Sequence, residues 1–390
     1  ITALLEMCFA NVEGGLEISL DGFAEADLIK ILFAENPSLI VQVANSNVGA
    51  FESLLNGQGI AYTAIGRPTD ERHILVDKAG ATYQFGIDHL REVWYATSYL
   101  LDTKQSHNGK AKERFENYKQ QPIELHFHPE WAGSFASLGI DADRRTPSGV
   151  KAAIIREKGT NGEREMAYML YLAGFDVKDV TMTDLVSGRE TLDDIHMIVF
   201  CGGFSNSDVL GSAKGWAGAF LYNPKAKAAL DRFYARPDTL SLGVCNGCQL
   251  MVELNLINPE HTSRARMLHN DSHKFESGFV GVTVQTNRTV LFGSLSGDQL
   301  GIWVAHGEGK FDLPLAEDQY NVVLKYNYEG YPANPNGSSY GVAGIASADG
   351  RHVAMMPHLE RAFLPWQTPF YPAERRADDC TPWLEAFVNA

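Results

Sequence analysis

The sequence predicts an α/β protein with a doubly wound, mostly parallel sheet, preceded by a smaller α+β domain fragment. Three observations favour this fold. From residue 150 onward, short apolar runs alternate with helical runs, as in parallel strands joined by helical crossovers. Residues 1–105 show a different mixture of helical and extended patterns. A chain of 390 residues is also too long for one ordinary core.

The first 105 residues predict an α+β unit. Three patterns predict its strands and helices: the periodicity of apolar residues, a glycine at the end of one helix, and a two-residue turn between two extended runs. The predicted elements are, in order, a helix at 24–35, a strand at 38–45, a helix at 48–59, a hairpin at 73–87 turning at Ala79 and Gly80, and an amphipathic helix at 88–105.

Residues 106–148 are rich in Lys, Glu, Gln, His, Pro and Asp and show little periodicity. We expect this segment to connect the first unit to a second domain at 149–390.

The second domain begins with buried-strand candidates separated by helical runs, and an antiparallel region is expected to complete it. Because ligands in doubly wound sheets bind beyond the carboxyl ends of strands, the turns after the strands are the expected place for a site. The predicted elements are strands at 150–157, 197–203, 239–245, 278–285, 301–311, 320–330 and 352–358, and helices at 163–175, 224–236 and 382–389.

The formal charge is −15, and both halves of the chain share the negative excess. Neither half offers a basic face, so nucleic acid and anionic membrane surfaces are not expected as partners. No apolar run reaches the roughly 20 residues that cross a bilayer, and no signal peptide pattern opens the chain. Five cysteines do not make a disulfide framework, so we expect a cytoplasmic protein. The start at Ile1, without a Met, indicates a piece of a longer chain.

Gly243-Val-Cys245-Asn-Gly247 has the form G-x-nucleophile-x-G, in which a strand stops abruptly and a helix begins. The glycines leave room for the turn and let backbone N–H groups approach a substrate. The start of the following helix brings a positive dipole end near the sulfur of Cys245, which favours the thiolate. This pattern predicts a nucleophile.

Three other interpretations of Cys245 stay open at this point. A cysteine after an apolar strand is often structural and inert. Cys245 and Cys248 form a CxxC pair, although no other feature indicates a thioredoxin-like fold. A zinc site needs about two further ligands at suitable spacing, and no second CxxC or HxxxH pattern is present, so no metal is expected.

A nucleophilic cysteine needs a base, and His358 is the best placed of twelve histidines. It follows the apolar run 352–357, and Glu360 stands two residues further on. On an extended segment that spacing puts both side chains on one face, so Glu360 is predicted to orient His358. An H-x-E pattern alone is more often a solvated strand end.

Acyl transfer also needs donors for the developing oxyanion. Gly202 and Gly203 follow the buried strand at 197–200, and the N–H of Gly203 or its neighbour is a candidate donor. The N–H of Asn246 is the predicted second donor. Taken alone, the two glycines indicate only a turn.

The motifs taken together resemble the C-terminal part of the large, single-chain phosphoribosylformylglycinamidine synthases, including their class I (triad) glutamine amidotransferase domain. Residues 1–105 look like the last part of the second aminoimidazole-ribonucleotide-synthetase-like half, so nearly the whole chain is covered. The motifs that carry the resemblance are GVCNGCQ, CGGFSxxDVLG, GWA, HNDSHKFE, HGEG, YPANPNGS, MMPHxER and PWLEAF.

The resemblance implies a flavodoxin-like class I glutaminase fold and a set of roles. Cys245 would attack the side-chain amide of glutamine, His358 would pass a proton to the departing ammonia, and Glu360 would hold His358. Gly203 and Asn246 would supply the oxyanion hole, and Gln249 would help to hold glutamine. His306, in the HGEG motif, would line the site in a supporting role.

The resemblance also implies partners and cofactors. Ammonia would pass to the synthetase domains of the same enzyme, which use ATP and magnesium to convert formylglycinamide ribonucleotide. The glutaminase domain itself would need no cofactor. No glycine-rich phosphate loop with a Lys is present in this chain, so by itself it is expected to show at most weak glutaminase activity.

One position departs from the family pattern, because Leu359 stands where proline is usual. Loss of proline loosens the chain beside His358, but we expect the geometry of His358 and Glu360 to persist. Two alternatives to the amidotransferase remain: a thiol hydrolase of the dienelactone-hydrolase kind, in which an Asp precedes the His, and a non-catalytic binding module.

Overall fold

The computed structural model describes all 390 residues, and the chain divides into two compact units, Ile1–Asp102 and Thr103–Ala390. Each unit has a hydrophobic core of its own. No helix in either unit combines the length and the apolar character that a membrane span requires.

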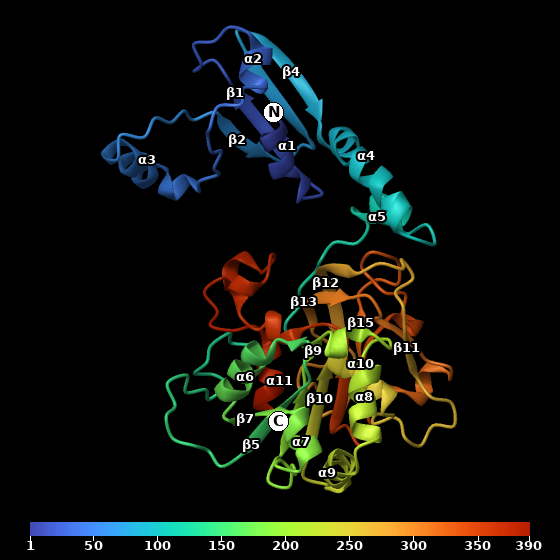
Figure 1. Cartoon of the computed structure of the whole chain (residues 1–390). Coiled ribbons are helices and arrows are strands. Elements are labelled where there is room, and N and C mark those ends of the chain that lie inside the picture. The colour runs from blue at the N-terminus through green and yellow to red at the C-terminus, as the bar shows by residue number, and fades with distance from the viewer. The chain divides into compact units, whose positions relative to one another are not determined.

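The first unit is built on a four-stranded sheet in the order β2-β1-β3-β4 (Figure 1). Ile74 and Val76 alternate along β3 and point into the core with no exposed surface. The hairpin predicted around Ala79 and Gly80 is confirmed, because these residues join β3 to β4. The elements are α1 (Thr2–Phe9), β1 (Gly15–Ser19), α2 (Leu28–Leu32), α3 (Val48–Gly57), β2 (Gly66–Thr69), β3 (His73–Lys78), β4 (Ala81–Gly86) and α4 (Ile87–Gln105).

The prediction for residues 24–45 is partly wrong. The expected helix at 24–35 is reduced to the five residues of α2, and residues 38–44 form no strand. Leu39 is 92% exposed, which shows that this β-branched run has neither a strand partner nor a core to cover it. A strand is stabilised by its neighbours, so its local composition alone was a poor guide.

Residues 106–148 differ from the predicted linker because they pack on the second unit. The segment contains the helix α5 (Lys110–Asn117), and Trp131 is only 3% exposed in the core of that unit. The guanidinium of Arg114 lies 2.8 Å from the carboxylate of Glu276. These contacts span many residues along the chain, so a polar composition with little periodicity did not reveal them.

The second unit contains a nine-stranded sheet in the order β13-β12-β15-β16-β17-β10-β8-β5-β7. The five neighbouring strands from β17 to β7 are parallel, and the strands from β16 to β13 are antiparallel. The predicted parallel strands and the antiparallel completion are thus confirmed. The sheet is mixed as a whole, and its parallel half carries the candidate site.

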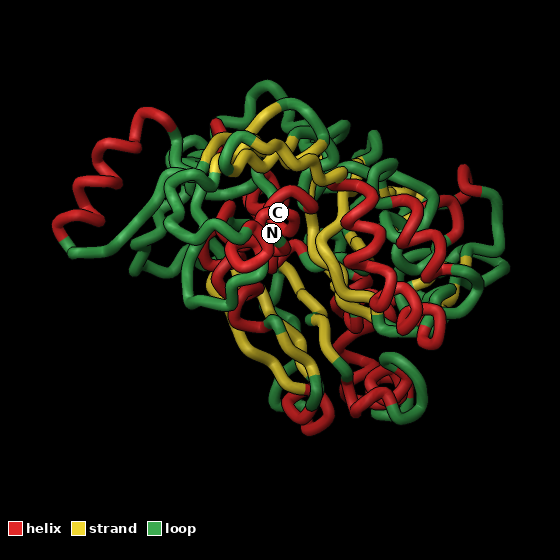
Figure 2. The backbone as a smooth tube through the Cα atoms, turned by 90° about the horizontal axis from the view of Figure 1, so that it is seen from above, coloured by secondary structure: helices red, strands yellow, loops and turns green.

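Helices cover the parallel half on both faces, with α8, α9 and α10 on one side and α6 on the other (Figure 1). In Figure 2, seen from above, red helices lie alongside yellow strands. Burial on both faces explains why the inner parallel strands are largely continuous apolar runs, whereas β7, at the edge of the sheet, is not. All four residues of β8 are buried, for example.

The second unit also contains several short 3₁₀ turns, among them η5 (Leu359–Arg361). Its other elements are β5 (Lys151–Arg156), β6 (Thr160–Asn161), α6 (Glu163–Leu172), β7 (Asp176–Thr181), α7 (Met182–Ser187), β8 (Met197–Phe200), β9 (Gly202–Gly203), α8 (Lys214–Leu221), α9 (Pro224–Ala235), β10 (Leu240–Val244), α10 (Asn246–Glu253), β11 (Arg266–Leu268), β12 (Glu276–Val284), β13 (Gln299–His306), β14 (Lys310–Asp312), β15 (Asn321–Tyr326), β16 (Val342–Ala346), β17 (His352–Met355) and α11 (Glu385–Val388).

The carboxyl ends of the three adjacent parallel strands β8, β10 and β17 lie side by side. The residues that follow them are Gly202–Gly203, Cys245 and His358. Segments far apart in the sequence therefore meet at the carboxyl ends of the strands, where doubly wound sheets bind ligands.

Candidate active site

Cys245 stands alone between β10 and α10 in a sharply bent conformation, with φ 52° and ψ −106°. A positive φ is strained for a residue with a side chain and costs about 1–3 kcal/mol. The bend is held because the N–H of Cys245 donates to Met355 O at 2.9 Å and its carbonyl accepts from the N–H of Gln249 at 3.0 Å. The strand-to-helix turn predicted for a nucleophile is therefore present.

The two flanking glycines are required by close packing. A β-carbon on Gly243 would lie 2.5 Å from Gly247 O, and one on Gly247 would lie 2.0 Å from Phe200 O. Any larger side chain would push α10 away from β10 and β8. The glycines of the G-x-C-x-G motif thus set the position of Cys245 relative to the end of β8.

His358 and Glu360 form a buried pair, with Nδ1 of His358 2.6 Å from Oε1 of Glu360. The side chains are 2% and 1% exposed. The predicted contact is present, although Glu360 lies in the 3₁₀ turn η5 and not on the extended segment expected for it. Leu359 is fully buried between them and does not prevent the contact.

The imidazole of His358 also meets Cys245. A β-carbon on Gly202 would lie 2.8 Å from Cε1 of His358 and 3.4 Å from Cβ of Cys245, so both side chains converge on the space that Gly202 leaves. Burial lowers the pKa of His358, but the charge of Glu360 and the nearness of Cys245 outweigh burial and raise that pKa to about 10. The buried Nε2 of His358 has no hydrogen-bond partner in the protein.

The neighbouring cysteines Cys201 and Cys248 are fully buried. Burial raises the pKa values of Cys201 and Cys248 well above the usual range, which leaves both as unreactive thiols. All five cysteines are free, so Cys245 and Cys248 form no disulfide. The Cys245 thiol donates to Ala305 O at 3.5 Å, at the end of β13. No group of three or more His, Cys, Asp or Glu side chains is arranged to hold a metal ion.

The glycines after β8 form the short strand β9, which pairs with β6. The N–H of Phe204 donates to Gly159 O, and Gly203 lies opposite Thr160. Gly203 has φ 119°, which residues with side chains rarely adopt.

Asn246 and Gln249 form a chain of hydrogen bonds beside the elbow. Oδ1 of Asn246 accepts from the N–H of Ser205 at 3.1 Å, and its Nδ2 donates to Oε1 of Gln249 at 2.9 Å. Nε2 of Gln249 donates in turn to Glu308 O at 2.8 Å. As the first residue of α10, Asn246 has a backbone N–H without an acceptor inside the helix.

His306 lies at the end of β13 and is 2% exposed. Burial and the positive charge of His358 lower the pKa of His306 to about 3, so its ring is neutral. Nδ1 of His306 lies 3.2 Å from Oδ1 of Asn270. Asn270 belongs to the HNDSHKFE motif, and its part in the site was missed because a single loop asparagine carries no chemical pattern of its own.

The segment after Gly203 adds strain that the sequence did not reveal. Asn206, Ser207 and Asp208 are consecutive left-handed residues, with φ between 50° and 57°. Such backbone is uncommon outside glycine and tends to occur at functional sites.

A family model for the CobB/CobQ-like glutamine amidotransferase domain matches residues 149–390. The whole chain is 37% identical to a probable phosphoribosylformylglycinamidine synthase of Arabidopsis thaliana and 36% identical to phosphoribosylformylglycinamidine synthase of Homo sapiens. It spans 29% and 31% of the lengths of these two relatives. These matches confirm the resemblance found in the motifs.

Among solved structures, PurLQS from Thermotoga maritima matches with a TM-score of 0.46 and 26% identity, over 62% of this chain and 96% of that one. The family match covers more than half of the chain and contains every residue of the candidate site. Through its residues 149–390, the chain belongs to the CobB/CobQ-like glutamine amidotransferase family.

Proposed function

We propose that residues 149–390 are a glutaminase that hydrolyses glutamine through a thioester on Cys245. The observation that carries the proposal is the convergence of Cys245 and His358 at Gly202, with Glu360 2.6 Å from the far side of the imidazole. This order of thiol, imidazole and carboxylate is what a nucleophile with its base and orienting group requires.

The reaction begins with proton transfer from the Cys245 thiol to Nε2 of His358. Glu360 stabilises the resulting imidazolium through Nδ1, as the raised pKa of His358 indicates. The thiolate attacks the side-chain carbonyl carbon of glutamine, and the N–H groups of Gly203 and Asn246 donate to the oxyanion. When the tetrahedral intermediate collapses, the C–N bond breaks and His358 gives its proton to the departing nitrogen. Ammonia leaves, and a glutamyl thioester remains.

Water then hydrolyses the thioester. His358 takes a proton from water, the hydroxide attacks the same carbonyl carbon, and the C–S bond breaks to return the Cys245 thiol and release glutamate. Glutamine and water are converted to glutamate and ammonia. Gln249, held between Asn246 and Glu308, helps to hold glutamine in this scheme.

The ammonia serves purine biosynthesis in this proposal, in the ATP-dependent conversion of formylglycinamide ribonucleotide to formylglycinamidine ribonucleotide. The names of the relatives support this assignment, and the chain spans less than a third of their length. Residues 1–105 are proposed to belong to the synthetase region, where ATP and magnesium would act. No step assigned to the glutaminase residues needs either cofactor. A cytoplasmic location stays a prediction.

A glutamine-mimicking diazoketone tests the proposal. We expect it to add covalently to Cys245, to be blocked by free glutamine, and to be lost in C245A and H358N. Labelling at another residue, or labelling that glutamine does not slow, would overturn the assignment. Faster turnover of a simple ester than of glutamine would favour a thiol hydrolase instead.

A further inference from the structure

The loop at the end of β13, residues 306–309, lies beside Gln249 of the candidate site. The carbonyl of Glu308 accepts a hydrogen bond from Nε2 of Gln249 at 2.8 Å. The carboxylate of Glu308 accepts from the N–H of Ser212 at 3.3 Å. The position of Gln249, and thus the proposed glutamine pocket, depends on how this 306–309 loop is held.

Asn270 holds the 306–309 loop with bonds to three of its four residues. The N–H of Asn270 donates to Gly307 O at 2.9 Å, and Nδ2 donates to His306 O at 2.7 Å. Oδ1 accepts from the N–H of Gly309 at 3.0 Å. Asn270 has no exposed surface, so water cannot replace these bonds.

The same amide sets the tautomer of His306. Because Nδ2 of Asn270 donates to His306 O and to Lys274 O, its Oδ1 faces Nδ1 of His306 at 3.2 Å. The ring is neutral, so its hydrogen lies on Nδ1 and its Nε2 is a bare acceptor. That buried Nε2 has no partner in the protein.

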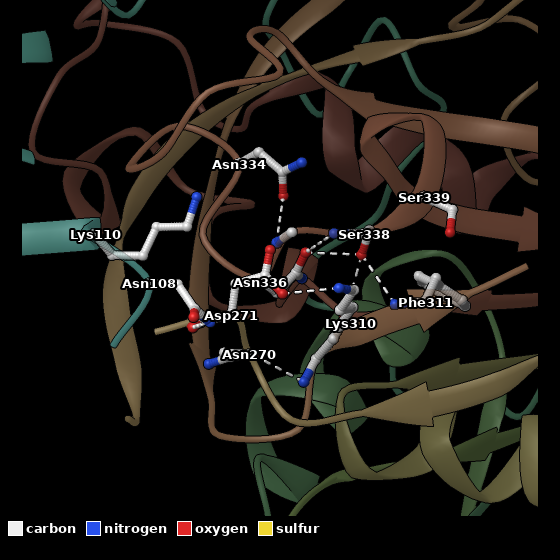
Figure 3. A network of polar contacts seen from close by, with 12 residues as sticks. Asn108, Lys110, Asn270, Asp271, Lys310, Phe311, Asn334, Asn336, Ser338 and Ser339 are labelled. Atoms are coloured by element: carbon white, nitrogen blue, oxygen red, sulfur yellow. Dashed lines mark hydrogen bonds and ion pairs between the residues drawn. The ribbon is translucent and has the colours of Figure 1, made fainter. Parts of the chain in front are cut away.

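A second contact fixes the same region from outside. Figure 3 shows Asn270 beside Asp271 and Lys310. Nζ of Lys310, the residue directly after the loop, lies 2.7 Å from Oδ1 of Asp271. Two consecutive residues, Asn270 and Asp271, therefore clamp the loop and the residue that follows it.

We infer that Asn270 is a positioning residue for glutamine binding, acting through the 306–309 loop on Gln249 and on the tautomer of His306. The inference rests on the proposed glutaminase function and deepens it. Asn270 touches no reacting atom and has no contact with Cys245, His358 or Glu360 among its hydrogen bonds, so its loss should weaken binding more than chemistry.

The test compares N270A with the wild type and with N334A. Asn334 is a matched control, because it is 5% exposed, lies in the same network in Figure 3, and its Oδ1 accepts only from the N–H of Gly337 in a turn. We expect N270A to raise the concentration of diazoketone that gives half-maximal inactivation about tenfold or more. The maximal inactivation rate and the rate of Cys245 alkylation by iodoacetamide should change less than about threefold. N334A should match the wild type in its half-maximal diazoketone concentration, its maximal inactivation rate and its rate of alkylation by iodoacetamide.

A spectroscopic measurement supports the test without relying on activity. In protein labelled with ¹⁵N-histidine, the His306 ring, assigned with H306Q, should carry its hydrogen on Nδ1 in the wild type and lose that preference in N270A. N270D keeps the size of the side chain but loses the donors to His306 O and Lys274 O. It should also weaken diazoketone binding. This variant replaces N270A in the test if N270A does not fold.

The outcomes separate the two claims. If the wild type is not labelled by the diazoketone, the proposed function fails and this inference with it. If the wild type is labelled and N270A or N270D binds the diazoketone as well as N334A does, or if wild-type His306 carries its hydrogen on Nε2, only the role of Asn270 is overturned.

Discussion

Nδ1 of His358 lies 2.6 Å from Oε1 of Glu360, and the two side chains are almost fully removed from water. An isolated buried imidazole resists protonation, so the carboxylate of Glu360 is what allows His358 to hold a proton beside Cys245.

Replacing Glu360 tests that relationship. In E360Q the charge of Glu360 that opposes burial is lost, so the pKa of His358 should fall from about 10 and His358 should be a weaker base for Cys245. We expect the rate of glutamine hydrolysis to fall about a hundredfold or more. The pH dependence of Cys245 alkylation by iodoacetamide measures the change directly.

Glu190 provides the control for this substitution, since it is 6% exposed and accepts from the N–H groups of Thr191 and Leu192, outside the candidate site. E190Q should leave the alkylation profile of Cys245 unchanged. An alkylation profile of E360Q that matches the wild type would show that Glu360 has no part in the reactivity of Cys245.

The space at Gly202 leads to a second prediction. G202A would place a methyl group 2.8 Å from Cε1 of His358, so the imidazole must move away from Cys245. We expect a folded protein with a diazoketone labelling rate reduced at least about tenfold, because a displaced base costs much of the catalysis. In G278A, where the added methyl group meets no atom within 4 Å, labelling should be unchanged. Equal labelling of both variants would contradict the geometry.

Much of the site could be predicted because its key residues follow strands directly. Cys245 comes at the end of an apolar run between two glycines, and His358 closes another such run, so strand ends and side-chain chemistry were enough to pair them. Glu360 was found through its spacing from His358, although the turn that brings it there is not extended.

What could not be predicted depends on contacts between distant segments. Asn270 supports the site from 25 residues beyond the elbow, through bonds to backbone atoms of the 306–309 loop that no side-chain pattern reveals. Residues 106–148 looked like a linker because their polar side chains find partners elsewhere, such as Arg114 on Glu276. Ala305 enters the site only through its carbonyl, which every residue type possesses.

The cysteines should differ in reactivity. Burial raises the pKa values of Cys201 and Cys248, and that of Cys380 to about 12, so these thiols stay protonated near neutral pH. We expect limiting iodoacetamide at pH 7.5 to modify Cys245 before these three, as peptide mapping by mass spectrometry would show. Cys248 modified as fast as Cys245 would mean that the pair acts as a redox or alkylation unit after all.

The stability of the second unit should depend on His352, at the opposite end of the parallel strands from Cys245. Burial lowers the pKa of His352 to about 4, while the unfolded chain binds a proton near pH 6.5. Because the unfolded state binds more protons between these values, this contribution to stability is lost as pH falls from about 6.5 toward 4, by roughly 3 kcal/mol.

Urea unfolding followed at several pH values measures this loss. H352Q should weaken the dependence of the free energy of unfolding on pH. H269Q, which replaces a histidine with a 70% exposed side chain, should leave that dependence unchanged. His358 acts in the other direction, because its raised pKa makes its contribution complete below pH 6.5 and lost as pH rises toward 10. If the free energy of unfolding changes equally with pH in H352Q and in the wild type, the role of His352 is contradicted.

The most direct measurement of the central claim is the mass of the protein quenched in acid during turnover of glutamine. The proposed chemistry predicts a glutamyl group attached to the peptide that contains Cys245, its disappearance when glutamine is exhausted, and its absence in C245A. Release of ammonia from glutamine by C245A at the wild-type rate, with no covalent glutamyl group in either protein, would contradict it.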